Sequence, residues 1–89
     1  PNYKEVILKK LCYTELVYGR MNKKLKKLSK DEIEELVLAV ISEAAEQDFV
    51  KTGKNIYITN YFRNIRLAIN SYTNRIITAD KLSEKTTNV

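Results

Sequence analysis

The clearest hydrophobic pattern lies between residues 30 and 47, where apolar positions recur at the spacing of one face of an α-helix. The positions that follow the i, i+3, i+4, i+7 pattern are Ile33, Leu36, Val37, Val40, Ile41 and Ala44. Ser29 precedes this run, and Glu32 lies three residues after Ser29, which is the spacing of a capping box. The pattern predicts a helix that begins near Lys30 and ends near Gln47.

The residues before this helix contain two weaker helical patterns. The first segment is indicated by Val6, Ile7, Leu8 and Leu11, and the second by Val17, Met21, Leu25 and Leu28. Periodicity does not decide whether the two segments are separate or form one helix through Cys12 and Tyr13. The sequence therefore predicts two or three helices in its first half.

The hydrophobic period changes to two after Asp48. Segments 53–60, 64–71 and 75–80 are rich in Ile, Tyr and Thr, and turns that contain Asn, Ser and Thr separate them. In the second segment the apolar residues Ile65, Leu67 and Ile69 alternate with Arg66, Ala68 and Asn70, as a half-buried strand requires. These features predict an α+β fold, in which the helices pack on the Ile65/Leu67/Ile69 face of a three-stranded antiparallel β-meander.

The whole pattern fits one domain that covers residues 1–82. The last seven residues, "SEKTTNV" at 83–89, lack a core-forming pattern, and we expect a frayed tail. Apolar residues make up 44% of the chain and charged residues 30%, which is an ordinary globular composition. We expect the chain to fold without a cofactor.

The stretch "CYTELVYGR" at 12–20 gathers a thiol, two phenols, a carboxylate and a guanidinium. The sequence contains no histidine to activate Cys12, so the interpretation is a small buried hydrophobe and not a nucleophile. We expect the rings of Tyr13 and Tyr18 at the margin of the core, and Gly19 at a close approach or a kink. Arg20 is expected to pair with Glu15 or Glu32. The stretch is thus typical of an element that packs a helix against the sheet.

The composition excludes several kinds of site and of localisation. One cysteine and no histidine exclude an internal disulfide and a Cys/His zinc site, so we expect no metal and no cofactor. The first residues do not resemble a secretory signal, and the longest apolar run, 36–41, is too short to cross a bilayer. The sequence therefore favours a cytoplasmic protein with no membrane partner.

Charge is unevenly distributed along the chain. Residues 1–30 carry nine basic and two acidic residues, residues 31–48 carry seven acidic residues and no basic one, and residues 49–89 carry seven basic and two acidic residues. The net charge is +5. The chain therefore alternates basic, acidic and basic in contiguous blocks.

The candidate binding residues lie on the predicted sheet and on a lysine-rich helix. Arg66 should face away from the core with Tyr57 and Arg75 beside it, and Tyr61 and Arg63 should lie at a hairpin. Lysines of the run "KKLKKLSK" form a second basic surface. The candidate set is Tyr57, Tyr61, Arg63, Arg66, Arg75, Lys23, Lys24 and Lys27. Basic residues beside aromatic ones are typical of surfaces that hold single-stranded nucleic acid, although cross-strand pairing favours the same residues for stability alone.

The predicted function is a non-enzymatic module that binds nucleic acid or a nucleic-acid-handling protein. In the second case the acidic helix would engage a basic groove, as an inhibitor encoded by a mobile element would. One alternative is a metal-independent ribonuclease toxin of the RelE type, with Arg66 and Arg75 on the phosphate and Lys54 or Tyr57 in proton transfer. The other alternative is a structural protein whose charge blocks pair between copies in an oligomer.

Three stretches carry a resemblance to a known family. "LCYTELVYGRMNKKL", "GKNIYITN" and "IRLAINSYTNRIITADK" resemble a family of short bacterial, archaeal and mobile-element proteins catalogued as domain of unknown function 3781. The resemblance covers the chain from about Leu11 to Lys81. It implies a stand-alone domain of this length with no established catalytic residues.

Overall fold

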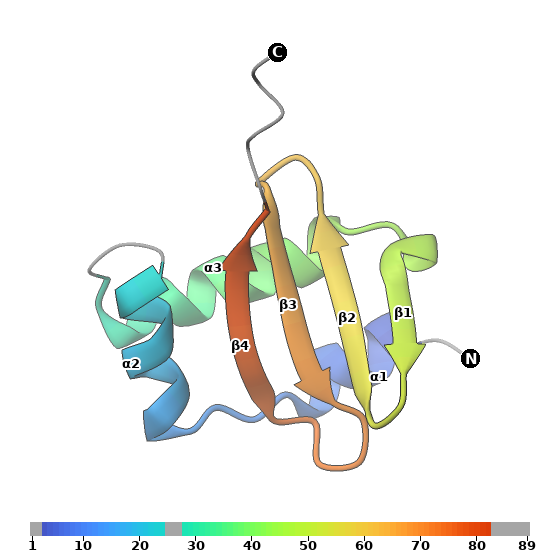
Figure 1. Ribbon diagram of the computed structural model, residues 1–89, viewed down its shortest axis with the longest axis horizontal. Helices are drawn as coiled ribbons and strands as arrows, with labels where there is room; N and C mark the ends of the chain where they lie inside the picture. Colours follow the sequence, from blue (N-terminus) through green and yellow to red (C-terminus); the bar gives the residue numbers. More distant parts are fainter. Residues whose placement is uncertain (1–2, 25–27, 83–89) are drawn as a thin grey trace.

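The computed structural model describes residues 3–24 and 28–82, and these form three α-helices followed by a four-stranded sheet (Figure 1). The elements are α1 (Tyr3–Lys10), α2 (Glu15–Lys24), α3 (Lys30–Glu43), a 3-10 turn η1 (Glu46–Asp48), β1 (Phe49–Thr52), β2 (Asn55–Asn60), β3 (Ile65–Asn70) and β4 (Ile76–Lys81). The α+β class is confirmed, and the first two helices are separate. The predicted frayed tail at 83–89 lies outside the described residues.

The strands form one antiparallel sheet in the order β1-β2-β3-β4. The prediction of three strands was wrong, because β1 is a short strand that the sequence pattern does not reveal. Its four residues "FVKT" bury only Phe49, so no alternation marks it. Gly53, Asn64 and Asn74 have positive φ angles of 63°, 63° and 59° in the turns that connect the strands. Gly and Asn tolerate this conformation best, which explains why they stand at these positions.

The helix α3 begins at Lys30 as predicted and ends earlier than predicted. Ser29 accepts a hydrogen bond from the Glu32 N–H, and the Glu32 carboxylate accepts one from the Ser29 N–H, which confirms the capping box. The helix ends at Glu43 and not near Gln47, because Ala44 adopts an extended conformation with φ −72° and ψ 144°. The following turn η1 then leads directly into β1.

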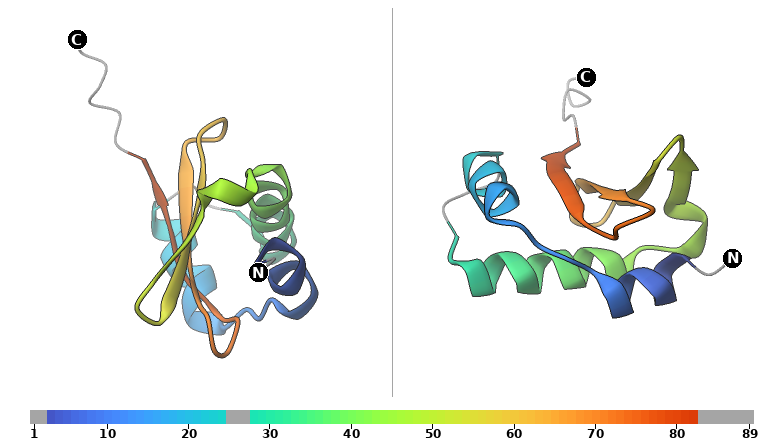
Figure 2. Two further views of the ribbon diagram at one scale, coloured as in Figure 1. Left: turned by 90° about the vertical axis from the view of Figure 1, so that its right-hand side faces the viewer. Right: turned by 90° about the horizontal axis from the view of Figure 1, so that it is seen from below.

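The core lies between α3 and the inner face of the sheet. Helices α1 and α3 cover this one face, whereas α2 lies beside the edge strand β4 (Figure 2). The fully buried side chains are Ile7, Val17, Met21, Ile33, Val37, Val40, Ile41, Ile58, Leu67 and Ile69. Burial of each such side chain contributes about 1.5 to 3 kcal/mol to folding. The predicted packing of helices on the Ile65/Leu67/Ile69 face is confirmed.

The segment between α1 and α2 covers part of the β4 edge. Cys12 N–H donates to the carbonyl of Asn74 at 2.8 Å, and Ile76 N–H donates to the carbonyl of Cys12 at 3.1 Å. The backbone of Cys12 therefore acts as a one-residue parallel strand. Its thiol is exposed, so the prediction of a buried cysteine was wrong. Cys12 pairs with the sheet through its backbone alone, so its side chain remains exposed to solvent.

Two other predictions for the stretch 12–20 need correction. A Cβ atom built on Gly19 would have no neighbour within 4 Å, and α2 continues through this residue, so Gly19 marks neither a close approach nor a kink. Arg20 pairs with neither expected carboxylate, because Glu15 binds Lys30 at 2.9 Å and Glu32 caps α3. The Arg20 guanidinium instead donates to the carbonyl of Ile77 at 3.1 Å.

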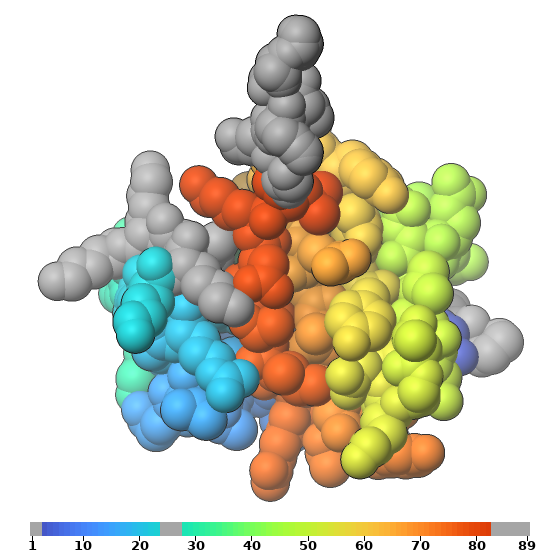
Figure 3. Space-filling model, viewed as in Figure 1, coloured from blue at the N-terminus to red at the C-terminus, as the bar shows by residue number. Residues whose placement is uncertain are grey.

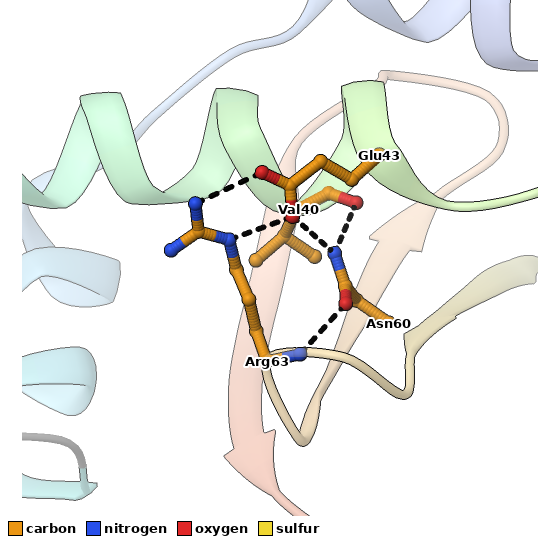
Figure 4. A network of polar contacts seen from close by, with 4 residues as sticks. All are labelled: Val40, Glu43, Asn60 and Arg63. Atoms are coloured by element: carbon orange, nitrogen blue, oxygen red, sulfur yellow. Dashed lines mark hydrogen bonds and ion pairs between the residues drawn. The ribbon is translucent and has the colours of Figure 1, made fainter.

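A polar network fastens the β2–β3 hairpin to the end of α3 (Figure 4). Asn60 is only 3% exposed, and its Nδ2 donates to the carbonyl of Val40 at 3.2 Å and to Oε1 of Glu43 at 3.1 Å. Its Oδ1 accepts from the backbone N–H of Arg63 at 2.8 Å. The Arg63 guanidinium then binds both oxygens of Glu43, at 2.8 and 2.9 Å. These hydrogen bonds from Arg63 and Asn60 lower the pKa of the Glu43 carboxyl.

Removal of the buried amide should destabilise the fold more than removal of the exposed ion pair. Asn60→Ala leaves buried polar groups without partners, and we expect a loss of about 2 to 3 kcal/mol in the free energy of unfolding, measured by urea denaturation. Arg63→Ala is the matched control, because it removes a partly exposed ion pair worth about 0 to 1 kcal/mol. Equal losses in the two variants would show that Asn60 does not anchor the hairpin.

Candidate functional site

The outer face of the sheet is the surface that α1 and α3 leave uncovered (Figure 3). The register places Tyr57 of β2 diagonally beside Arg66 of β3, and the guanidinium lies over the phenol ring at 5.7 Å from its centroid. Asn55 donates to the Tyr57 hydroxyl at 3.3 Å, and Asp80 of β4 stands opposite Arg66. Two of the predicted binding residues, Tyr57 and Arg66, are thus in contact on the outer face.

A groove lies at one end of this surface, between α2 and β4. It has a volume of about 420 Å³ and is lined by Thr14, Leu16, Val17, Arg20, Asn70, Thr73, Arg75, Ile76 and Ile77. No acidic residue belongs to this lining. The groove therefore combines two guanidinium groups with apolar walls.

The backbone around Arg75 is held on both sides. Its carbonyl accepts from the N–H of Asn70 at 2.9 Å, and its neighbours Asn74 and Ile76 are bonded to Cys12. Its own N–H donates to Oγ1 of Thr73 at 3.3 Å. Within the described residues the Arg75 guanidinium has no hydrogen-bond or ion-pair partner. The backbone of Arg75 is therefore held in place, and its guanidinium is available to a ligand.

Arg20 is a second cation of the groove, which sequence reasoning did not include among the binding residues. Its contact with the Ile77 carbonyl holds the guanidinium at the β4 edge, next to the position of Arg75 in the groove lining. No sequence pattern links Arg20 to Arg75, because the two residues are far apart in the chain. Both line one groove only because α2 packs beside β4.

The other predicted binding residues lie elsewhere. Tyr61 is 72% exposed at the tip of the β2–β3 hairpin beside Phe62, which is 88% exposed. Arg63 of the same hairpin is bound to Glu43. Lys23 is exposed on α2, whereas Lys27 and the side chain of Lys24 lie outside the described residues. The predicted set is therefore divided among the outer face, the groove, the hairpin and α2.

The acidic residues gather on α3. Within the described residues, α3 carries one basic residue, Lys30, and the acidic residues Asp31, Glu32, Glu34, Glu35 and Glu43. The sheet lies between these carboxylates and its own outer face (Figure 1). Arg66 lies on that outer face, and Arg20 and Arg75 line the groove, whereas α1 behind the sheet carries Lys4, Lys9 and Lys10.

A family model described as "Protein of unknown function (DUF3781)" matches residues 5–80, which is most of the chain. The chain belongs to this family. The match confirms the resemblance of the three sequence stretches and extends it into α1. No curated protein and no solved structure matches the chain.

The described part of this DUF3781 chain contains no group of three or more His, Cys, Asp or Glu residues placed to hold a metal ion. None of its helices has the length and apolar character that a membrane crossing requires.

Tyr13 and Tyr18 of this DUF3781 chain form a stacked pair between α2 and α3. Their ring centroids are 5.8 Å apart, and the ring planes differ by 11°. The Tyr18 hydroxyl donates to the Glu34 carboxylate, and this bond is the main reason why its pKa rises to about 12. Burial, followed by the charge of Glu34, raises the pKa of Tyr13 to about 12 as well. Both phenols therefore stay protonated at neutral pH, and the pair acts in packing.

The Tyr18–Glu34 bond predicts a stability loss at alkaline pH. Because the folded pKa of about 12 exceeds the ordinary value of 10.0, the contribution of this bond is complete below pH 10 and is lost as the pH rises toward 12. We expect the stability difference between the parent protein and Tyr18→Phe to be constant below pH 10 and to shrink above it, in urea denaturation. Tyr61→Phe is the control, and a pH-independent difference for Tyr18→Phe would contradict the assignment.

Proposed function

We propose that this DUF3781 chain is a non-enzymatic module that binds single-stranded nucleic acid on the outer face of its sheet. The observation that carries the proposal is the Arg66–Tyr57 pair, which lies on the sheet face that the helices leave uncovered. When the Arg66 guanidinium moves from above the Tyr57 ring to a phosphate, a neighbouring base can stack on the ring in its place. The ring faces of unpaired bases are accessible, which favours a single strand over a duplex.

The charge distribution supports this orientation. Arg66 lies on the outer face, and Arg20, Lys23 and Arg75 lie at its β4 edge, whereas the acidic residues of α3 lie behind the sheet. Nucleic acid is therefore attracted to the outer face more than to α3. The acidic helix is a weaker binding surface, because Glu32, Glu34 and Glu43 already bind Ser29, Tyr18 and Arg63.

The same contacts favour binding over cleavage. Arg66 lies in β3 and pairs in register with Asp80 of β4, whereas Arg75 precedes the first residue of β4. Asn70, to which Arg75 is bonded, is four residues from Arg66, a separation of about 13 Å along a strand. Two cations at this spacing bind different phosphates along a strand. A ribonuclease would need both cations at one phosphate.

Variants of the Arg66–Tyr57 pair should weaken binding in two different ways. Tyr57→Ala removes the stacking platform, and we expect a loss of about 1 to 3 kcal/mol in the binding free energy of a labelled single-stranded oligonucleotide. Tyr57→Phe keeps the ring and should bind nearly as well as the parent. Arg66→Gln removes one phosphate contact. The slope of log K against log salt concentration should therefore become less steep by about 0.7.

The charge control is Lys9→Gln, which removes one positive charge from α1 on the helical side. It should leave both the affinity and the salt dependence close to those of the parent. Binding that is insensitive to Tyr57→Ala and Arg66→Gln while both variants stay folded would contradict the proposal. Shortening of the oligonucleotide during incubation, abolished by Tyr57→Phe, would favour the ribonuclease instead.

A further inference from the structure

The groove between α2 and β4 has the features of a site for a phosphorylated nucleoside. We propose that it binds a nucleoside 5′-monophosphate unit, either as a free nucleotide or as the 5′ end of a nucleic acid strand. The second source rests on the function proposed above, because the strand on the outer face would end in the groove. The shared chemistry is a dianionic phosphate attached to an apolar, planar body.

The two guanidinium groups account for the phosphate. Arg20 and Arg75 both line the groove, and no acidic residue lines it to neutralise them. Arginine presents a planar fork of donors that matches two oxygens of a phosphate. Nη1 of Arg20 donates a hydrogen bond to the Ile77 carbonyl, which fixes the side chain and leaves its other donors available. The side-chain donors of Arg75 form no hydrogen bond within the described residues.

The size and the walls of the groove account for the nucleoside. A volume of about 420 Å³ falls within the range of small-molecule sites and exceeds what a phosphate ion alone would fill. Leu16 of α2 is 64% exposed and Ile77 of β4 is partly exposed, so these two side chains provide the apolar surface of the groove, whereas Val17 and Ile76 are buried in the core. A planar base can lie against these two side chains. A ligand that is charged throughout would gain nothing from them.

Asn70 supplies a polar group for the body of the ligand. Its Oδ1 accepts from the N–H groups of Tyr72 and Thr73, at 2.8 and 3.0 Å, and these bonds fix the orientation of the amide. Its Nδ2 donates no hydrogen bond to any described residue. Asn70 lines the groove, so this nitrogen is a donor for a ribose or base oxygen.

The site is organised before a ligand enters. The turn that carries Arg75 is closed by the bond from Asn74 N–H to the Asn70 carbonyl at 2.8 Å, and Cys12 clamps its outer side. Binding therefore has to order the Arg75 side chain but not the backbone that carries it. The Cys12 bridge therefore has a second effect beyond covering the sheet edge, since it sets the position of a binding residue.

The first experiment uses free ligands and isothermal titration calorimetry on the full chain. Adenosine 5′-monophosphate should bind at least tenfold more tightly than adenosine and than inorganic phosphate, because each of these lacks one half of the recognised structure. Arg75→Gln should weaken binding of the nucleotide by about tenfold, the loss expected for one charge-assisted hydrogen bond. Lys51→Gln is the charge-matched control on β1, at the opposite edge of the sheet, and should change the affinity for the nucleotide less than about twofold. Equal binding of phosphate and nucleotide would overturn the assignment to a nucleoside.

The second experiment compares single-stranded oligonucleotides of one sequence with a 5′-phosphate, a 5′-hydroxyl or a 3′-phosphate. If the strand end is the ligand, the 5′-phosphate form binds more tightly, and Arg75→Gln removes this preference while Tyr57→Ala weakens all three forms alike. Nucleotide binding without oligonucleotide binding would support the groove site with a free nucleotide and contradict the proposed function. Oligonucleotide binding that depends on Tyr57 but not on Arg75 or the end group, with no nucleotide binding, would overturn the groove site alone.

Discussion

The structure depends on the packing of α3 against the inner face of the sheet. Ile33, Val37, Val40 and Ile41 are completely buried in this contact, together with Ile58, Leu67 and Ile69 from the strands. A small domain has only one core, so this contact must supply most of the free energy that offsets the chain entropy lost on folding. It also determines which face of the sheet is covered and which remains exposed.

The two edges of the sheet differ in whether another segment covers them, and the groove lies at the covered edge. At the β4 edge, Cys12 pairs with the start of the strand, and α2 packs alongside through Val17 and Met21. At the β1 edge the strand has only four residues and carries Lys51, both of which discourage pairing with another chain. The covered edge is thus where a helix and a strand meet, and Arg20 and Arg75 are brought together there.

The arginines show that charge alone does not identify a binding residue. Arg63 is bound to Glu43 and holds the hairpin, Arg66 lies over Tyr57, and the Arg75 guanidinium has no hydrogen-bond or ion-pair partner in the described part of the chain. A guanidinium held by a carboxylate must break that bond before it binds a ligand, whereas the Arg75 guanidinium has no such cost. Of these three arginines, Arg75 is therefore the most available to a ligand.

The sequence by itself determined the elements whose signals are local. The capping box at Ser29, the apolar face of α3 and the alternation of Ile65, Leu67 and Ile69 each depend on neighbours within a few residues, and each prediction is confirmed. The sequence also placed the Tyr57–Arg66 pair on one face, because strand periodicity determines which side chains share a face. It did not reveal β1, the exposed thiol of Cys12 or the end of α3 at Glu43. The pairing of β1, the Cys12 bridge and the placement of Arg20 and Arg75 in one groove were decided by contacts between segments distant in the chain, which only the packed tertiary structure specifies.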